Sequence, residues 1–224
     1  RKIITPSSLF CKTLLVFLLF IVQANAQVKV LNNDLRRLGT GTVNSINTKG
    51  TPEQPFYYSG TSWKKLTYST YGLDIICGIG GVGTSNWNNT GTIVENPVLT
   101  NTVYDYSGFT TTDAVENGHG TIKVSGNTTI GGQVFLMENT YTLLQNDKYF
   151  TIKVKITNQS ATTATNVRVW FGTRDDYIGS TDTPYKIRGN ITNGAFSQIP
   201  TIATQSKAIK IYSGSEGVLF FSNS

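Results

Sequence analysis

Apolar and polar residues alternate along much of the chain with the two-residue period of a half-buried β-strand. In the segment 149–157 every second residue from Phe150 to Ile156 is apolar, and Lys153 and Lys155 take two of the positions between them. The segment 165–173 repeats the pattern, and the polar linker 158–164 has a length compatible with a β-hairpin. The two segments therefore predict neighbouring strands, each with one face in water.

Similar runs recur between turn-forming Gly, Asn and Pro residues. They predict strands at 27–31, 56–58, 63–79, 93–94, 97–106, 120–125, 133–144, 208–212 and 218–222. No long segment after residue 26 has the 3.6-residue apolar period of a helix. Short strands with closely spaced turns predict an all-β protein, a β-sandwich of two packed antiparallel sheets. A loop-like stretch near residue 90 divides it into an N-terminal β segment or small subdomain, 27–90, and a main β-sandwich, 91–224.

The first 26 residues follow a different pattern. The basic residues Arg1, Lys2 and Lys12 precede the uninterrupted apolar run Leu14–Val22. The triplet Ala-Asn-Ala at 24–26, with small residues at its first and third positions, follows the run. A basic start, a short apolar stretch and such a triplet predict a signal peptide at 1–26, cleaved between Ala26 and Gln27. The apolar run has nine residues, whereas a membrane-spanning helix needs about 20. We therefore expect a secreted mature chain that does not span a membrane.

The distribution of charge argues against nucleic acid as a partner. The net charge of +6 falls to +3 without the signal peptide, because 16 basic and 13 acidic residues remain. These charges are interspersed, and the densest basic spots, Lys64-Lys65 and Arg36-Arg37, are short. We therefore expect no nucleic-acid binding. The abundance of Thr, Asn, Gly and Ser, with eleven Tyr and eleven Phe, favours strands and turns of an extracellular β protein.

Catalysis has few candidate residues. Cys77 is the only cysteine after the signal peptide and lies in an apolar run, which predicts a small buried side chain. The single histidine, His119, lies in a turn-like Gly-containing context, and no zinc-ligand spacing surrounds it. The chain has no G-x-S-x-G motif, and the sequence cannot pair the carboxylates that a glycosidase needs. We expect a protein that is not an enzyme.

The densest polar cluster is the segment 172–190, which we expect to be a long charged loop. Asp175, Asp176 and Asp182 offer hard oxygen ligands for Ca²⁺, although their spacing is not that of an EF-hand. The cluster could instead bind a glycan or peptide, or form a salt-bridge network that holds the loop. The candidate ligand-binding residues are Arg174, Asp175, Asp176, Tyr177, Asp182, Lys186 and Arg188. No cofactor other than Ca²⁺ is expected.

Aromatic residues near these polar segments are candidates for stacking on sugar rings. Trp63, Trp87 and Tyr177 lie among turn-forming or charged residues, where a ring can be presented to solvent. Core or interface packing is the more common role for any single aromatic residue of this kind, and it stays the alternative for each of them.

The end of the signal peptide, the Thr-, Asn- and Gly-rich composition and the sequence Asn-Val-Arg-Val-Trp-Phe-Gly-Thr-Arg-Asp-Asp-Tyr at 166–177 resemble secreted surface proteins of Bacteroidetes. The chain is most similar to the N-terminal region of the very large gliding-motility adhesins of flavobacteria. The resemblance implies export by the type IX secretion system, a place on the outer cell surface, and partners in the secretion and surface-motility machinery.

The resemblance also implies that such a protein grips surfaces or polysaccharide, and it supplies no catalytic residue. A C-terminal sorting region is expected in such adhesins and none is visible here, so we expect a piece of a longer polypeptide. A carbohydrate-binding module or carbohydrate-active enzyme domain, and a purely structural surface domain, remain the alternatives.

Overall fold

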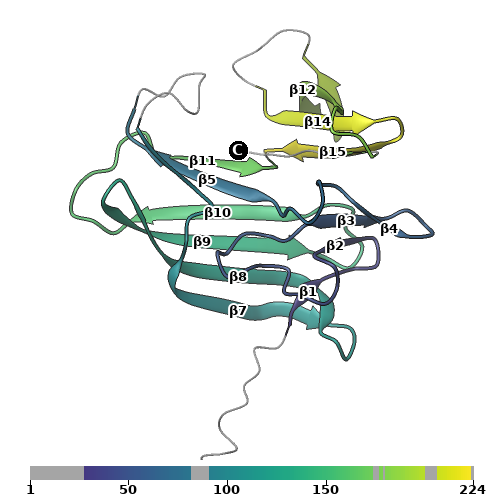
Figure 1. Cartoon of the computed structure of the whole chain (residues 1–224), viewed down its shortest axis with the longest axis horizontal. Helices are drawn as coiled ribbons and strands as arrows, with labels where there is room; N and C mark the ends of the chain where they lie inside the picture. Colours follow the sequence, from purple (N-terminus) through teal and green to yellow (C-terminus); the bar gives the residue numbers. More distant parts are fainter. Residues whose placement is uncertain (1–27, 82–90, 174–176, 179, 200–205, 223–224) are drawn as a thin grey trace, which may run out of the picture.

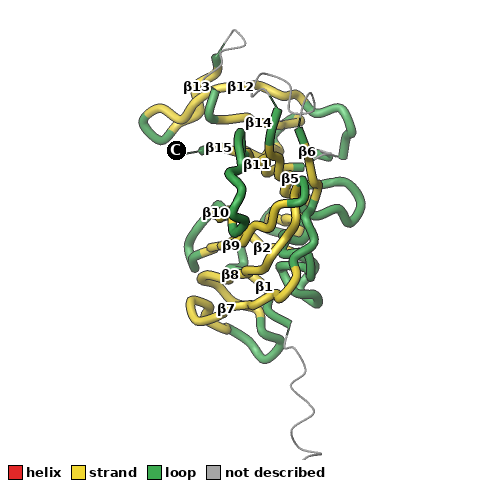
Figure 2. Tube along the Cα trace, turned by 90° about the vertical axis from the view of Figure 1, so that its left-hand side faces the viewer, coloured by secondary structure: helices red, strands yellow, loops and turns green. Residues whose placement is uncertain are grey.

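The computed structural model describes residues 28–81, 91–173, 177–178, 180–199 and 206–222. These residues form fifteen strands, and the described part contains no helix (Figures 1 and 2). The strands make four sheets, in which all but one of the strand pairs are antiparallel. The predicted all-β, sandwich-type fold is confirmed.

The largest sheet has five strands (Figure 1). Its members are β1 (Val30–Leu31), β7 (Thr100–Thr111), β8 (Asn117–Ile130), β9 (Gln133–Leu143) and β10 (Thr151–Asn158). β7, β8, β9 and β10 follow one another as antiparallel neighbours, and β1 pairs in parallel with the first residues of β8. Along β8 and β9 buried residues alternate with more accessible ones, so one face of the sheet is in the core.

The second layer is a three-stranded sheet of β5 (Asp74–Ile79), β6 (Thr92–Glu95) and β11 (Arg168–Gly172), in the order β11-β5-β6. The expected hairpin between the neighbouring segments 149–157 and 165–173 is wrong, because β11 pairs with β5 and not with β10. Alternation fixes which face of a strand is buried but not which strand lies beside it. The linker 158–164 instead carries the chain from one layer to the other.

The remaining strands form two smaller antiparallel sheets. The first contains β2 (Arg36–Leu38), β3 (Pro55–Tyr58) and β4 (Trp63–Lys65). The predicted single strand 63–79 is therefore wrong in its middle, since β4 ends at Lys65 and β5 begins at Asp74. The turn between them carries Ser69 with a φ of 45°, a left-handed conformation that a continuous strand cannot contain.

The second small sheet has four strands in the order β13-β12-β14-β15. Their bounds are β12 (Tyr185–Thr192), β13 (Ala195–Gln198), β14 (Ala208–Ser213) and β15 (Glu216–Phe221). This sheet lies at the top of Figure 1, beyond β11.

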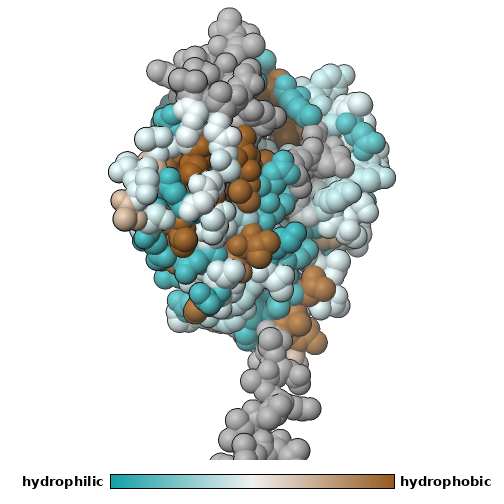
Figure 3. Space-filling model, turned by 60° about the vertical axis from the view of Figure 1, so that its left-hand side comes forward, coloured by the Kyte–Doolittle hydropathy of each residue, from teal (hydrophilic) through white to brown (hydrophobic). Residues whose placement is uncertain are grey.

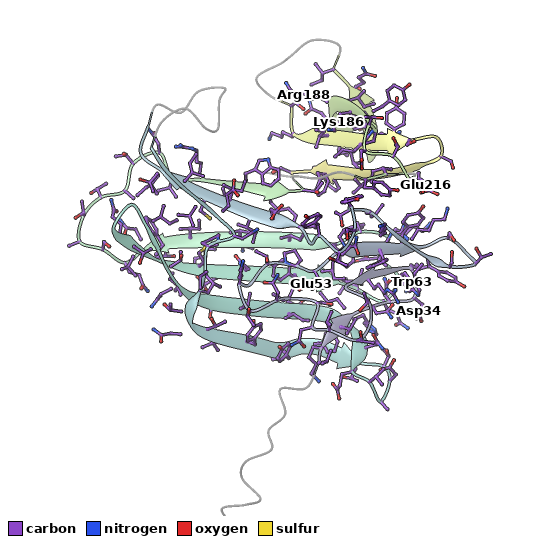
Figure 4. All side chains as sticks on the ribbon, viewed as in Figure 1. Asp34, Glu53, Trp63, Lys186, Arg188 and Glu216 are labelled. Carbon is purple, nitrogen blue, oxygen red and sulfur yellow. The ribbon has the colours of Figure 1, made fainter. Side chains whose placement is uncertain are left out.

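An ion pair connects this four-stranded sheet to the β2-β3-β4 sheet. Lys64 of β4 pairs with Glu216 of β15, which points toward β3 and β4 in Figure 4. Lys64 and the neighbouring Tyr57 hold the pKa of Glu216 below its usual value. Burial, followed by the nearby Glu216 carboxylate, raises the pKa of Tyr57 to about 12. The polar contact thus joins two sheets that are far apart along the chain.

The core fills the space between the five-stranded sheet and the β11-β5-β6 sheet. Ile122 and Val124 of β8 contribute side chains from the first sheet, and Ile75 and Cys77 of β5 contribute side chains from the second. Elsewhere the surface is mixed: the side shown in Figure 3 exposes apolar residues as separate patches among hydrophilic ones. Burial of this core supplies the main stabilising free energy of the fold.

A turn at 47–51 enters the core from the segment between β2 and β3. The Gly50 carbonyl oxygen accepts hydrogen bonds from the Tyr141 hydroxyl (2.6 Å) and the Asn139 amide (3.1 Å), both of β9 and both buried. The Tyr104 hydroxyl of β7 donates to the Asn47 carbonyl at 3.0 Å. Because buried polar groups are costly unless hydrogen-bonded, these bonds hold the turn against the inner face of the sheet.

Strand pairs cross the predicted boundary at residue 90. β1 pairs with β8, and β5 pairs with both β6 and β11. Described residues on both sides of residue 90 therefore contribute to one core, and the division into 27–90 and 91–224 stays a prediction.

We predict that Gly50→Ala destabilises the protein by about 2–4 kcal/mol, judged from the cost of a left-handed residue and of overpacking a core. Gly50 has a φ of +75°, and an added Cβ would lie 2.7 Å from Leu99 Cδ1. Gly60→Ala is the matched control, because Gly60 has a φ of +93° but no atom within 4 Å of the added Cβ. Urea unfolding measures both variants, and an equal loss in the two would contradict the packing of this turn.

Candidate functional site

Part of the predicted charged site lies outside the described residues. Arg174, Asp175 and Asp176 belong to that part, as does the predicted cleavage position between Ala26 and Gln27. Among the described residues, no group of three or more His, Cys, Asp or Glu side chains is arranged to hold a metal ion. Since two of the three proposed ligands are not among them, the Ca²⁺ site stays a prediction.

The other four predicted site residues lie in three places. Lys186 and Arg188 lie on β12, so the expectation of one continuous loop over 172–190 is wrong in its second half. The sequence Tyr-Lys-Ile-Arg at 185–188 alternates as a strand does, and it pairs with β14. Both cations project from the upper sheet in Figure 4, whereas Tyr177 turns to the segment after β4 and Asp182 lies exposed before β12.

Tyr177 belongs to a cluster of three tyrosines, which we call the tyrosine cluster: Tyr68, Tyr71 and Tyr177. The Tyr68 and Tyr177 rings meet edge to face with centroids 5.3 Å apart, and Tyr68 and Tyr71 stack at 6.4 Å. The ammonium group of Lys65 lies 5.8 Å from the Tyr68 centroid and 5.1 Å from that of Tyr177. Tyr71 is 58% exposed and Tyr68 is 43% exposed, so the cluster presents aromatic surface to solvent.

A cleft of about 580 Å³ opens beside the tyrosine cluster, and Tyr71 forms part of its wall. This volume is in the range of small-molecule sites in proteins. Most of the lining side chains are polar. The lining residues are Asn47, Thr48, Lys49, Thr51, Tyr71, Gly72, Leu73, Asp74, Asn96 and Thr173.

Hydrogen bonds fix the polar wall formed by the start of β5. The Asn96 side-chain amide donates to the Asp74 carboxylate, and the Asn96 side-chain oxygen Oδ1 accepts from the Ile75 backbone amide at 3.0 Å. Asn96 has a φ of 45°, which an asparagine tolerates better than most residues. Thr173 directly follows β11 and brings the beginning of the charged segment to the same wall.

The opposite wall is the turn held in the core. The Asn47 side-chain oxygen accepts from the Lys49 and Thr51 backbone amides, at 3.0 and 3.2 Å. The Asn47 side-chain amide donates to the Thr51 hydroxyl at 2.7 Å. Since both cleft walls are tied by such short-range bonds, the cleft is formed before any ligand arrives.

A second cleft, of about 430 Å³, is less suited to recognition. It lies at the 158–164 linker against Phe135 and Ile156, and no charged residue lines it. The first cleft therefore offers the richer set of polar groups.

The residues considered for catalysis are not placed for it. Cys77 is fully buried, and burial raises the pKa of its thiol to about 12, which leaves little reactive thiolate. His119 lies half-buried within β8 and not in the expected surface turn. Neither residue lines the 580 Å³ cleft.

The tyrosine cluster itself was not expected from the sequence, apart from Tyr177. Tyr68 and Tyr71 fall inside the segment 63–79 that the sequence predicts as a strand, and Lys65 belongs to a short basic spot. The sequence Tyr-Ser-Thr-Tyr-Gly at 68–72 contains turn-forming residues. These residues indicate a loop, in which the two tyrosine rings can be exposed.

Comparisons with known proteins found no matching family model, no matching curated protein and no matching solved structure. Within the described residues, no helix has the length and apolar character needed to cross a membrane. The function must therefore be argued from the site.

We predict that Glu53→Gln raises the free energy of unfolding at pH 7. Burial, opposed by a hydrogen bond from Asn47, raises the pKa of Glu53, so folding disfavours its charged form. A raised carboxyl pKa gives stability at low pH that is lost as the pH rises through the folded-state pKa. The gain from Gln should therefore be present at pH 7 and vanish near pH 3.5.

Urea unfolding at the two pH values tests this expectation. Glu138→Gln is the control, because Glu138 pairs with Lys155 on the outer face of the large sheet and its removal should not stabilise. A Glu53→Gln protein that is less stable than wild type at pH 7 would contradict the assigned burial.

Proposed function

We propose that the chain is a non-enzymatic, carbohydrate-binding domain of a secreted cell-surface adhesin. The single observation that carries this proposal is the preformed polar cleft bordered by the tyrosine cluster. Exposed rings stack on the apolar faces of sugars, while side-chain amides, hydroxyls and carboxylates bond their hydroxyl groups. The cleft combines both kinds of group on a β scaffold.

The composition of the cleft walls supports sugar recognition over catalysis. Asn47, Thr51, Asn96 and Thr173 supply neutral polar groups, whereas Asp74 is the one carboxylate among the cleft-lining residues described. Hydrolysis of a glycosidic bond ordinarily requires two placed carboxyl groups. Binding without chemistry is the function for which the described groups suffice.

The wider setting of the proposal follows from the sequence resemblance. We place the domain on the outer cell surface, after export by the type IX secretion system, where it would attach cells to surface polysaccharide during gliding motility. The secretion and surface-motility machinery would be its protein partners. The signal-peptide pattern and the absence of a basic nucleic-acid-binding arm support this setting.

A carbohydrate-active enzyme domain is the second candidate. It is favoured by the same cleft together with the carboxylates of the charged segment, two of which lie outside the described residues. Reducing-end release from a polysaccharide, abolished in Asp175→Ala and Asp176→Ala, would establish this candidate in place of binding alone.

We predict that Tyr71→Ala weakens binding to the glycan that the protein prefers by roughly fivefold to tenfold, the loss expected for one stacked ring. Tyr71 is exposed and its side chain lines the cleft, so truncation should leave the fold intact. A glycan panel followed by calorimetric titration measures the effect.

Tyr185→Ala is the matched control for this variant. Tyr185 is 69% exposed and stacks on Tyr212 at 5.5 Å, but it lies on β12, away from the cleft. Equal losses in the two variants, or binding to no member of the panel, would count against the proposed function.

A further inference from the structure

We propose that the carbohydrate bound by this protein is an extended acidic polysaccharide, of the uronate type, and that the cationic surface of β2, β3 and β4 recognises its carboxylates. This inference rests on the proposed function and adds the charge and shape of the ligand. The supporting observation is a small sheet with cations and aromatic rings on the same face. This face continues into the tyrosine cluster.

Strand register places five side chains on one face of the β2-β3-β4 sheet, and we call this set the aromatic–cationic face. Phe56 lies opposite both Arg37 and Lys65, and Tyr58 lies opposite Trp63. Successive side chains of a strand point to opposite faces of the sheet. Adjacent residues of β3 or of β4 therefore lie on different faces, and residues two positions apart share one face. The members are Arg37, Phe56, Tyr58, Trp63 and Lys65.

The cations of this face are held by rings. The Arg37 guanidinium lies 4.8 Å from the Phe56 centroid and 4.4 Å from the Trp63 centroid. Trp63 in turn packs against Tyr58 at 5.4 Å. Cation–π contact orients a positive charge without neutralising it.

Neither Arg37 nor Lys65 has a carboxylate partner among the described residues, where the ion pairs are Lys29–Glu116, Lys64–Glu216 and Lys155–Glu138. The Arg37 Nε is buried and has no hydrogen-bond partner in the same part of the chain. Arg37 is half-buried, so its charge is partly desolvated. A partly desolvated charge without a counter-charge is unfavourable, and an anionic ligand would relieve that cost. A carboxylate is a suitable anion, because a guanidinium can bind its two oxygens at once.

The aromatic–cationic face continues without a break into the cleft. Lys65 belongs to the face and also lies over Tyr68 and Tyr177. Tyr71 connects those rings to the cleft, which adds the exposed cation Lys49. Rings and positive charges therefore alternate along a path longer than one sugar, which fits a chain of charged sugars better than a single monosaccharide.

The test compares oligogalacturonate with the same oligosaccharide after reduction of its carboxyl groups to neutral hydroxymethyl groups. We expect the intact chain to bind oligogalacturonate more tightly than the reduced form, with a difference that shrinks at high salt. The double variant Lys49→Gln/Lys65→Gln should lose roughly fivefold in affinity for oligogalacturonate and less than twofold for the reduced form.

The matched control is Lys123→Gln/Lys153→Gln, which removes the same net charge from the outer face of the large sheet. Lys123 and Lys153 are both exposed and flank Thr140 in register. An equal loss in this control would overturn the inference, because it would show unspecific attraction. Tighter binding of a single-stranded oligonucleotide than of oligogalacturonate would overturn it as well.

Two further outcomes separate this inference from the proposed function. Equal binding of both oligosaccharides would overturn acidic recognition and leave carbohydrate binding standing. Binding of neither oligosaccharide, nor of any member of a neutral glycan panel, would overturn both.

Discussion

The structure depends on a single backbone carbonyl placed inside an apolar core. The Gly50 carbonyl oxygen accepts hydrogen bonds from the Tyr141 hydroxyl and the Asn139 side-chain amide, both of β9. A hydrogen bond left unmade in such surroundings costs about 1–3 kcal/mol, so the turn must sit where these donors can reach it. Glycine is favoured there, because the backbone is left-handed and the Leu99 side chain would have to shift to admit a Cβ.

This turn links the core to the surface that we assign to binding. Its Asn47 and Thr51 face the cleft, while its carbonyl groups face the sheet. The chain leaves the turn through Glu53 and Gln54 into β3, and the Gln54 amide donates to the Thr67 and Ser69 carbonyls just before Tyr71. The tyrosine cluster and the aromatic–cationic face are therefore positioned by hydrogen bonds that begin in the core.

The sequence predicts local features well where burial alone decides them. β10 has the expected half-buried apolar face, with Lys153 and Lys155 exposed on the other, and Cys77 is buried as expected. Strand partners are less predictable, because the partner of β11 lies about ninety residues earlier, in β5. A two-residue period carries no information about which edge a strand will join.

The candidate site is harder to predict for the same reason. The charged segment was the expected site, yet only Tyr177 and Thr173 connect it to the cleft among the residues described. Lys186 and Arg188 belong to a strand of another sheet. The cleft brings together residues from 47–51, 71–74, 96 and 173, and no local pattern links those four segments.

Hydrogen exchange of the backbone amides, with and without saturating oligogalacturonate, tests the central claim most directly. The account predicts slower exchange at 47–51 and 66–73 on binding, and unchanged exchange in 121–129 of β8 and 151–157 of β10, two strands of the large sheet that do not line the cleft. Protection confined to those two strands or to β12–β15, or no change anywhere, would contradict the claim that the cleft and the tyrosine cluster form the site for an acidic polysaccharide.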